Sequence, residues 1–172
     1  MPEGASPSLA PLLSGESLER FLTQARLRGA RVVFTNGCFD LIHPGHAAYL
    51  EEARALGDLL LVGLNTDRSV RLLKGPGRPL VPEDGRALLL RSLRSVDGVI
   101  LFHEETPLSL IRLIRPAFLV KGGDYAPDAV VGAREILEWG GELRILPFRA
   151  GYSTSDLVFR IRNLKGDKPL SA

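Results

Sequence analysis

The sequence predicts an α/β fold in which five parallel strands form one sheet with helices on both faces. Two observations carry this prediction. Apolar, β-branched segments alternate five times with segments of helical spacing. The apolar segments also contain few polar residues, as strands covered on both faces do. The expected strands cover residues 31–36, 58–65, 96–102, 116–123 and 142–148. The expected helices cover residues 17–29, 44–57, 83–95, 106–115, 128–141 and 153–164.

Proline and glycine mark the helix boundaries. Gly29 and Gly57 stand at or just past the ends of the first two expected helices, where glycine readily adopts a left-handed backbone. Pro44 lies in a first helical turn, where its missing N–H costs nothing. Thr106 is expected as an N-cap, with Pro107 at the first helical position. The whole arrangement is Rossmann-like, and ligands of such sheets bind beyond the carboxyl ends of the strands, where the strand order reverses.

Three segments are expected along the chain. Residues 1–30 form an N-terminal arm and helix, residues 31–164 form the single main domain, and residues 165–172 form a C-terminal tail. Residues 1–14 are rich in Pro, Ser, Gly and Ala, which predicts a loose arm.

Composition excludes several classes of protein. The net charge of the 172 residues is only +2, so a nucleic-acid partner is not expected. The longest apolar run, residues 59–64, is far too short to cross a bilayer. The N-terminus lacks the basic and hydrophobic segments of a signal peptide, and the single cysteine excludes an internal disulfide framework. We therefore expect a cytoplasmic protein without a membrane partner.

Polar and glycine-rich segments follow most of the expected strands. Two familiar phosphate-binding motifs are absent from them: G-x-G-x-x-G after the first strand, and G-x-x-x-x-G-K-[ST] anywhere. This argues against a dinucleotide-dependent oxidoreductase and against a P-loop NTPase.

The segment after the first strand, TNGCFDLIHPGHAAYL, places His43 and His46 three positions apart. A zinc site would need more ligands; Cys38 and Asp40 are near, but His103 is the only other histidine. Alternatively, one histidine caps the helix and the other packs in the core.

A phosphate-binding site fits this segment better. Pro44 and Gly45 let a helix begin abruptly after the strand, with free backbone N–H groups and a positive dipole end at the cleft. Gly37 and Gly45 also permit a close approach of backbone and ligand. His43 and His46 can then each donate a ring N–H to a phosphate oxygen.

A second helix start carries three hydroxyl groups, in the sequence GYSTSD. Ser153, Thr154 and Ser155 follow a glycine there. One of them is expected to cap the helix, which is the ordinary use of such residues. The others are available to a ligand, and two helix starts at one cleft suit the charges of a nucleoside triphosphate.

These motifs resemble a known superfamily. GCFDLIHPGH is similar to the G-x-F-D-x-x-H-x-G-H signature of the cytidylyltransferase-like nucleotidyltransferases, and GYSTS resembles their second signature, G-x-S-T-T. The segments NTDRSVRLLKGPGRP and VKGGDY resemble one group, the D-glycero-β-D-manno-heptose 1-phosphate adenylyltransferases, which form the nucleotidyltransferase half of bacterial ADP-heptose synthases. The resemblance covers roughly residues 32–163.

The resemblance implies that an acceptor sugar phosphate attacks the α-phosphate of ATP in line and releases pyrophosphate, with Mg²⁺ bound through the nucleotide phosphates. It also implies a homo-oligomer, and a separate heptose kinase that makes the acceptor. The implied catalytic residues are His43, His46 and Lys74. The implied nucleotide-binding residues are Asn36, Gly37, Cys38, Phe39, Asp40, Gly45, Lys121, Gly122, Asp124, Ser153, Thr154 and Ser155. The implied substrate-binding residues are Asn65, Asp67 and Arg86, and no residue is implied as a metal ligand.

Simpler interpretations stay open for several of these residues. Lys74 is alternatively a solvated loop lysine, Arg86 an exposed helical arginine, and Cys38 a small packing residue. The superfamily often has an arginine three positions before its second signature; here that position is Phe148, followed by Arg149.

Other functions stay open as well. They are transfer from CTP to glycerol 3-phosphate, another adenylyl transfer, a non-catalytic nucleotide sensor, and a zinc-binding structural module.

Overall fold

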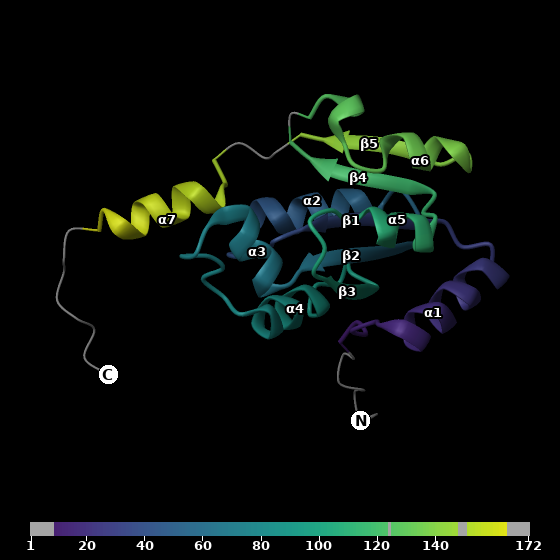
Figure 1. The fold of residues 1–172 in the computed structure, drawn as a ribbon, viewed down its shortest axis with the longest axis horizontal. Coiled ribbons are helices and arrows are strands. Elements are labelled where there is room, and N and C mark those ends of the chain that lie inside the picture. Colours follow the sequence, from purple (N-terminus) through teal and green to yellow (C-terminus); the bar gives the residue numbers. More distant parts are fainter. Residues whose placement is uncertain (1–8, 124, 148–150, 165–172) are drawn as a thin grey trace, which may run out of the picture.

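The computed structural model describes residues 9–123, 125–147 and 151–164. Its five strands form one parallel sheet in the order β3-β2-β1-β4-β5 (Figure 1). They are β1 Val32–Gly37, β2 Leu59–Asn65, β3 Gly98–Phe102, β4 Phe118–Gly122 and β5 Glu142–Leu146. The chain builds the sheet outward from β1 to β3, then crosses to the other side of β1 for β4 and β5. The predicted fold is confirmed, and its strand order reverses between β1 and β4.

Helices follow the strands in the expected alternation. They are α1 Gly15–Leu27, α2 Pro44–Arg54, α3 Asp67–Lys74, α4 Glu83–Arg91, α5 Leu108–Ile114, α6 Ala133–Glu138 and α7 Thr154–Arg162, with a 3-10 turn, η1, at Pro127–Ala129. Among the helices in the described part of the chain, none has the length and apolar character needed to cross a membrane.

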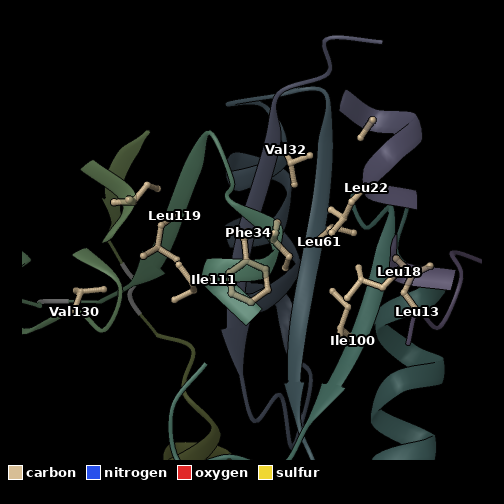
Figure 2. Close-up of a cluster of buried hydrophobic side chains, with 13 residues drawn as sticks. Leu13, Leu18, Leu22, Val32, Phe34, Leu61, Ile100, Ile111, Leu119 and Val130 are labelled. Atoms are coloured by element: carbon tan, nitrogen blue, oxygen red, sulfur yellow. The ribbon is translucent and has the colours of Figure 1, made fainter. Parts of the chain in front are cut away.

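Successive strand residues point to opposite faces of the sheet, and both faces are covered. On one face, Phe34 packs with residues of α1 and α5, among them Leu22 and Ile111 (Figure 2). On the other face, the neighbouring Val33 packs with Leu50 of α2 and with residues of α4. This double coverage explains why the strands are apolar at almost every position.

The N-terminal segment is part of the core. The loose arm expected over residues 1–14 is wrong for the residues that the structure describes there. Leu12 forms a β-bridge with Val99, and the backbone N–H of Leu13 donates to the carbonyl of Val99 at 2.8 Å. The side chains of Leu13 and Leu18 are buried in the same cluster as Phe34. The hydrophobic core therefore continues across the expected boundary at residue 30.

Three helical expectations need correction. Thr106 is not an N-cap, because Pro107 holds that position and α5 begins at Leu108. The segment after β2, which is not among the six expected helices given above, forms α3. The helix expected over residues 128–141 is shortened to η1 and α6, which are separated by the turn at Gly132, with φ at 90°. Glycine is the residue that adopts this backbone conformation without strain.

The two ends of the sheet differ in character. At the amino ends of β1, β4 and β5 lies a hollow of about 270 Å³, lined by Arg31, Pro116, Trp139 and Gly141 among others. The residues singled out from the sequence lie at the carboxyl ends instead. The hollow is therefore not the site where those residues gather.

Candidate functional site

The first group of candidate residues starts α2, directly after β1. His43 is the N-cap, and its Nδ1 accepts a hydrogen bond from the backbone N–H of His46 at 3.3 Å. Pro44 takes the first helical position. Because Nδ1 accepts, the neutral imidazole of His43 carries its proton on Nε2. Capping and donation are thus compatible in one side chain: Nδ1 serves the helix, and Nε2–H stays a donor.

The two imidazole rings are stacked, with centroids 3.8 Å apart, and Phe39 packs against His46 at 5.3 Å. Burial lowers the pKa of His46 to about 4, with a smaller contribution from His43. Burial also lowers the pKa of His43. Both rings are therefore neutral at pH 7, and they offer N–H donors rather than positive charge.

The start of α7 reaches the start of α2. The ring of Tyr152 lies 6.4 Å from the ring of His43, and a Cβ added to Gly45 would lie 3.0 Å from the Cβ of Tyr152. A larger residue at Gly45 would push these two segments apart. Ser153 caps α7 by accepting the backbone N–H of Asp156 at 3.0 Å. The structure thus brings both expected helix starts together, although α7 itself contains no buried residue.

The other hydroxyl residues of this start differ in exposure. Thr154 is half-buried and Ser155 is exposed. Neither is the N-cap of α7.

On the β4 side of the strand-order reversal, Lys121 donates a hydrogen bond to Oδ1 of Asn36, which lies in β1. Burial lowers the pKa of Lys121 to about 8. Gly122 follows it and ends β4. Asp124, another expected nucleotide contact, lies outside the described residues, as do Phe148 and Arg149. Lys121 is thus a partly desolvated cation of β4 that is hydrogen-bonded to β1.

Asp40 is the buried anchor of the turn before α2. It is only 3% exposed, and its Oδ1 accepts the backbone N–H groups of Leu80 and Val81 at 2.7 and 3.0 Å. Its Oδ2 lies 2.7 Å from Nε of Arg78, a close ion pair without the linear geometry of a hydrogen bond. Asp40 was expected to contact nucleotide; its contacts in the structure are with the loop between α3 and α4.

Arg86 is fully buried, at 0% exposure, so the exposed helical arginine considered from the sequence is wrong. Its Nη1 donates to the carbonyls of Cys38 and Asn65 at 2.6 and 2.8 Å, and its Nη2 donates to Asp67 at 2.7 Å. Its Nε donates to the carbonyl of Val81 at 2.9 Å. These bonds join the carboxyl ends of β1 and β2 to the following loops, so the geometry assigns Arg86 a positioning role.

Lys74 ends α3, with an exposed side chain. Burial raises the pKa of the Cys38 thiol, and Lys74, Arg86 and Arg78 act on that thiol in the opposite direction. The positive charge of α3 and its following loop therefore lies near the turn that holds Cys38. Asn65 is buried and donates to Ser69 at 3.0 Å, inside the same region.

The zinc interpretation finds no support in this geometry. Nδ1 of His43 is used within α2. Among residues 9–123, 125–147 and 151–164, no three His, Cys, Asp or Glu side chains are grouped so as to hold a metal ion.

Sequence reasoning gave Arg78 no role. It lies in the segment LLKGPGRP that carries part of the resemblance, and that motif was the available signal. It also missed the hydrogen bond between the hydroxyls of Thr35 and Tyr49, at 2.6 Å, which ties α2 to β1.

Comparison with known proteins defines the class of this site. The family model for cytidylyltransferase-like proteins matches residues 34–160, which include the starts of both α2 and α7. The crystal structure of the lipopolysaccharide core biosynthesis protein from Thermoplasma volcanium GSS1 superposes on this chain with a TM-score of 0.57 at 30% sequence identity. The superposition covers 70% of this chain and 98% of that one. The chain is a nucleotidyltransferase and belongs to the cytidylyltransferase-like family.

Curated relatives narrow the resemblance to particular proteins. The chain is 50% identical over 163 residues to the bifunctional protein HldE of Photobacterium profundum, covering 95% of this chain and 34% of that protein. It is 54% identical over 136 residues to HldE of Methylobacillus flagellatus, covering 79% of this chain and 28% of that protein. The chain thus spans about a third of the length of the curated relatives it matches.

Proposed function

We propose that this chain transfers the adenylyl group of ATP to D-glycero-β-D-manno-heptose 1-phosphate, giving ADP-heptose and pyrophosphate. The observation that carries the proposal is the meeting of the α2 and α7 starts beside the reversal of strand order, through the contact of Tyr152 with His43 and Gly45. Similarity to HldE proteins over 95% of the chain supports the choice of acceptor.

In this mechanism an oxygen of the acceptor phosphate forms a bond to the α-phosphorus of ATP. The bond from that phosphorus to the bridging oxygen breaks, and pyrophosphate leaves with the electron pair. The attacking oxygen is already anionic, so no general base is required. The protein contributes position and stabilisation of charge.

The chain's own groups have distinct roles in the proposal. Nε2–H of His43 and the ring N–H of His46 donate to phosphate oxygens. Lys121 and the α7 start with its hydroxyl side chains lie toward the nucleotide phosphates. Lys74 neutralises charge between the nucleotide and the acceptor. The neutral state of both histidines fits donation without requiring a proton from solution.

Mg²⁺ bound through the nucleotide phosphates is also part of the proposal, and it supplies charge neutralisation there. The carboxylates of Asp40 and Asp67 fit this arrangement, because they are engaged with Arg78 and Arg86. The ion is therefore proposed to depend on phosphate oxygens rather than on protein ligands. A cytoplasmic location, a homo-oligomeric assembly and a heptose kinase activity that supplies the acceptor complete the proposal.

The experiment is a grid of pyrophosphate release. Purified protein with Mg²⁺ receives ATP, CTP, GTP or UTP, each with heptose 1-phosphate, glycerol 3-phosphate or phosphopantetheine. Release with ATP and heptose 1-phosphate, and ADP-heptose identified by mass, is the expected result. Release only with CTP and glycerol 3-phosphate would reject the proposed substrates, and nucleotide binding without release from any pair would favour a sensor.

A histidine variant tests the mechanism. His46→Gln should reduce the rate of turnover by roughly a hundredfold, because loss of one preorganised donor costs about 3 kcal/mol of transition-state stabilisation. His103→Gln is the matched control, since His103 is exposed after β3. Turnover of His46→Gln within a few-fold of wild type would remove His46 from the mechanism.

A further inference from the structure

The loop between α3 and α4 is fixed to the turn before α2 by one buried carboxylate. Asp40 accepts the backbone N–H groups of Leu80 and Val81 and pairs with Nε of Arg78 at 2.7 Å. A buried carboxylate without partners costs several kcal/mol, so it strongly favours the arrangement that supplies these three contacts. The backbone of this loop and the side chain of Arg78 are therefore held in one place relative to α2.

This contact leaves the other end of Arg78 available. Its side chain is 24% exposed, and the contact with Asp40 is made at Nε, at 2.7 Å. Among the described residues, neither terminal nitrogen of Arg78 donates a hydrogen bond. A guanidinium held at Nε and open at its two terminal nitrogens presents the planar pair of donors that suits a phosphate group.

The charges near the turn before α2 also indicate Arg78. His43 and His46 are neutral at pH 7, and the guanidinium of Arg86 is occupied by carbonyls and by Asp67. Lys74 and Arg78 are then the cations that act on the turn from the α3–α4 side, as their effect on the Cys38 thiol indicates. An incoming phosphate dianion approaching a triphosphate needs such a partner.

We propose that Arg78 binds the phosphate group of the acceptor, with Asp40 as its positioning residue, and that this contact makes the site select phosphorylated acceptors. The inference rests on the proposed function for the identity of the acceptor. Arg78 orients the phosphate whose oxygen bonds to the α-phosphorus, and its charge offsets repulsion between the two substrates.

The test separates binding of the acceptor from binding of the nucleotide. Arg78→Gln should raise KM for heptose 1-phosphate about 10- to 100-fold, the range for losing a charged hydrogen-bonding partner, while KM for ATP stays within twofold. Arg78→Lys should recover only part of this loss, because one ammonium cannot both pair with Asp40 and replace the guanidinium fork. Arg20→Gln removes an exposed arginine paired with Glu16 on α1 and is the matched control.

Calorimetric titration tests acceptor binding without turnover, so its result can be separated from that of the proposed function. Heptose 1-phosphate is titrated into wild type and Arg78→Gln in the presence of a non-hydrolysable ATP analogue and Mg²⁺. Binding to wild type that is lost in Arg78→Gln supports the inference even if no pyrophosphate is released. Equal acceptor binding by both proteins, loss of ATP-analogue binding instead, or no acceptor binding by wild type would each overturn it.

Discussion

Replacement of Arg86 by methionine should strongly destabilise the fold, and the size of the effect follows from its contacts. The substitution removes the donors to the carbonyls of Cys38, Asn65 and Val81, and to the carboxylate of Asp67. Each buried acceptor left without a donor costs about 1–3 kcal/mol. The simple sum is an overestimate, because the side chain of Asp67 is 25% exposed and water can solvate it.

We therefore expect a loss of about 3–5 kcal/mol in the free energy of unfolding, the usual cost of breaking a buried ion pair from one side. This is a large share of the roughly 5–15 kcal/mol that stabilises an ordinary domain. The assay is urea unfolding followed by fluorescence of Trp139, the only tryptophan. Its indole N–H donates to the carbonyl of Pro116 at 3.0 Å, so unfolding changes its surroundings.

The matched control is Arg112→Met. Arg112 also pairs with a carboxylate, that of Glu135 at 3.0 Å, but its side chain is 61% exposed. A surface pair of this kind contributes about 0–1 kcal/mol. A loss below about 1 kcal/mol for Arg86→Met, equal to that of the control and with an unchanged denaturant slope, would refute the positioning role of Arg86.

Three further predictions follow from burial and close approach. The free energy of unfolding should fall by on the order of 2–3 kcal/mol as pH falls from 6.5 to about 4. In this range His46 is protonated in the unfolded chain but stays neutral in the folded protein, because burial lowers its pKa to about 4. Urea titrations across this pH range should therefore show a smaller loss of stability for His46→Gln than for wild type. Lys121→Met should be at least as stable as wild type at pH 7, because the substitution removes a partly desolvated ammonium. The same variant should bind ATP at least about tenfold more weakly by calorimetry. A large loss of stability with normal ATP affinity would contradict this prediction. Gly132→Ala should lower stability by about 1–3 kcal/mol, because its Cβ would lie 2.6 Å from Cδ1 of Ile111, and Gly140→Ala, at a positive φ in open space, should cost less in the same thermal scan.

The sheet could be predicted from the sequence because its signal is local. Val33 and Phe34 are adjacent, both apolar and both fully buried on opposite faces, which is the pattern of a strand covered on both sides. The pattern of α3 is less direct. Its buried residues are Ser69 and Val70, while Leu72 and Leu73 are exposed, so its apolar residues do not mark the face that packs against the sheet.

The contacts that organise the candidate site are long-range, and no local pattern encodes them. Asp40 meets Leu80 across 40 positions, and Arg86 meets Cys38 across 48. From the sequence, Asp40 and Arg86 were expected to contact a ligand, because charged side chains beside a phosphate motif are usually exposed. Their burial shows that such charges can instead stabilise the loops that carry the exposed groups.

The distribution of cations around β1 gives the proposed chemistry a geometric basis. β1 lies between β2 and β4. Lys121 lies on the β4 side and is bonded to Asn36, whereas Lys74 and Arg78 act on the turn from the segment that follows β2. In-line displacement requires the attacking and leaving oxygens on opposite sides of the transferring phosphorus. In the proposed arrangement, Lys74 and Arg78 hold the acceptor phosphate on the β2 side of the turn, and Lys121 holds the departing pyrophosphate on the β4 side. The two neutral imidazoles lie between them. Under this arrangement, Arg78→Gln and Lys121→Met should impair different substrates, and equal loss of both substrates in both variants would contradict it.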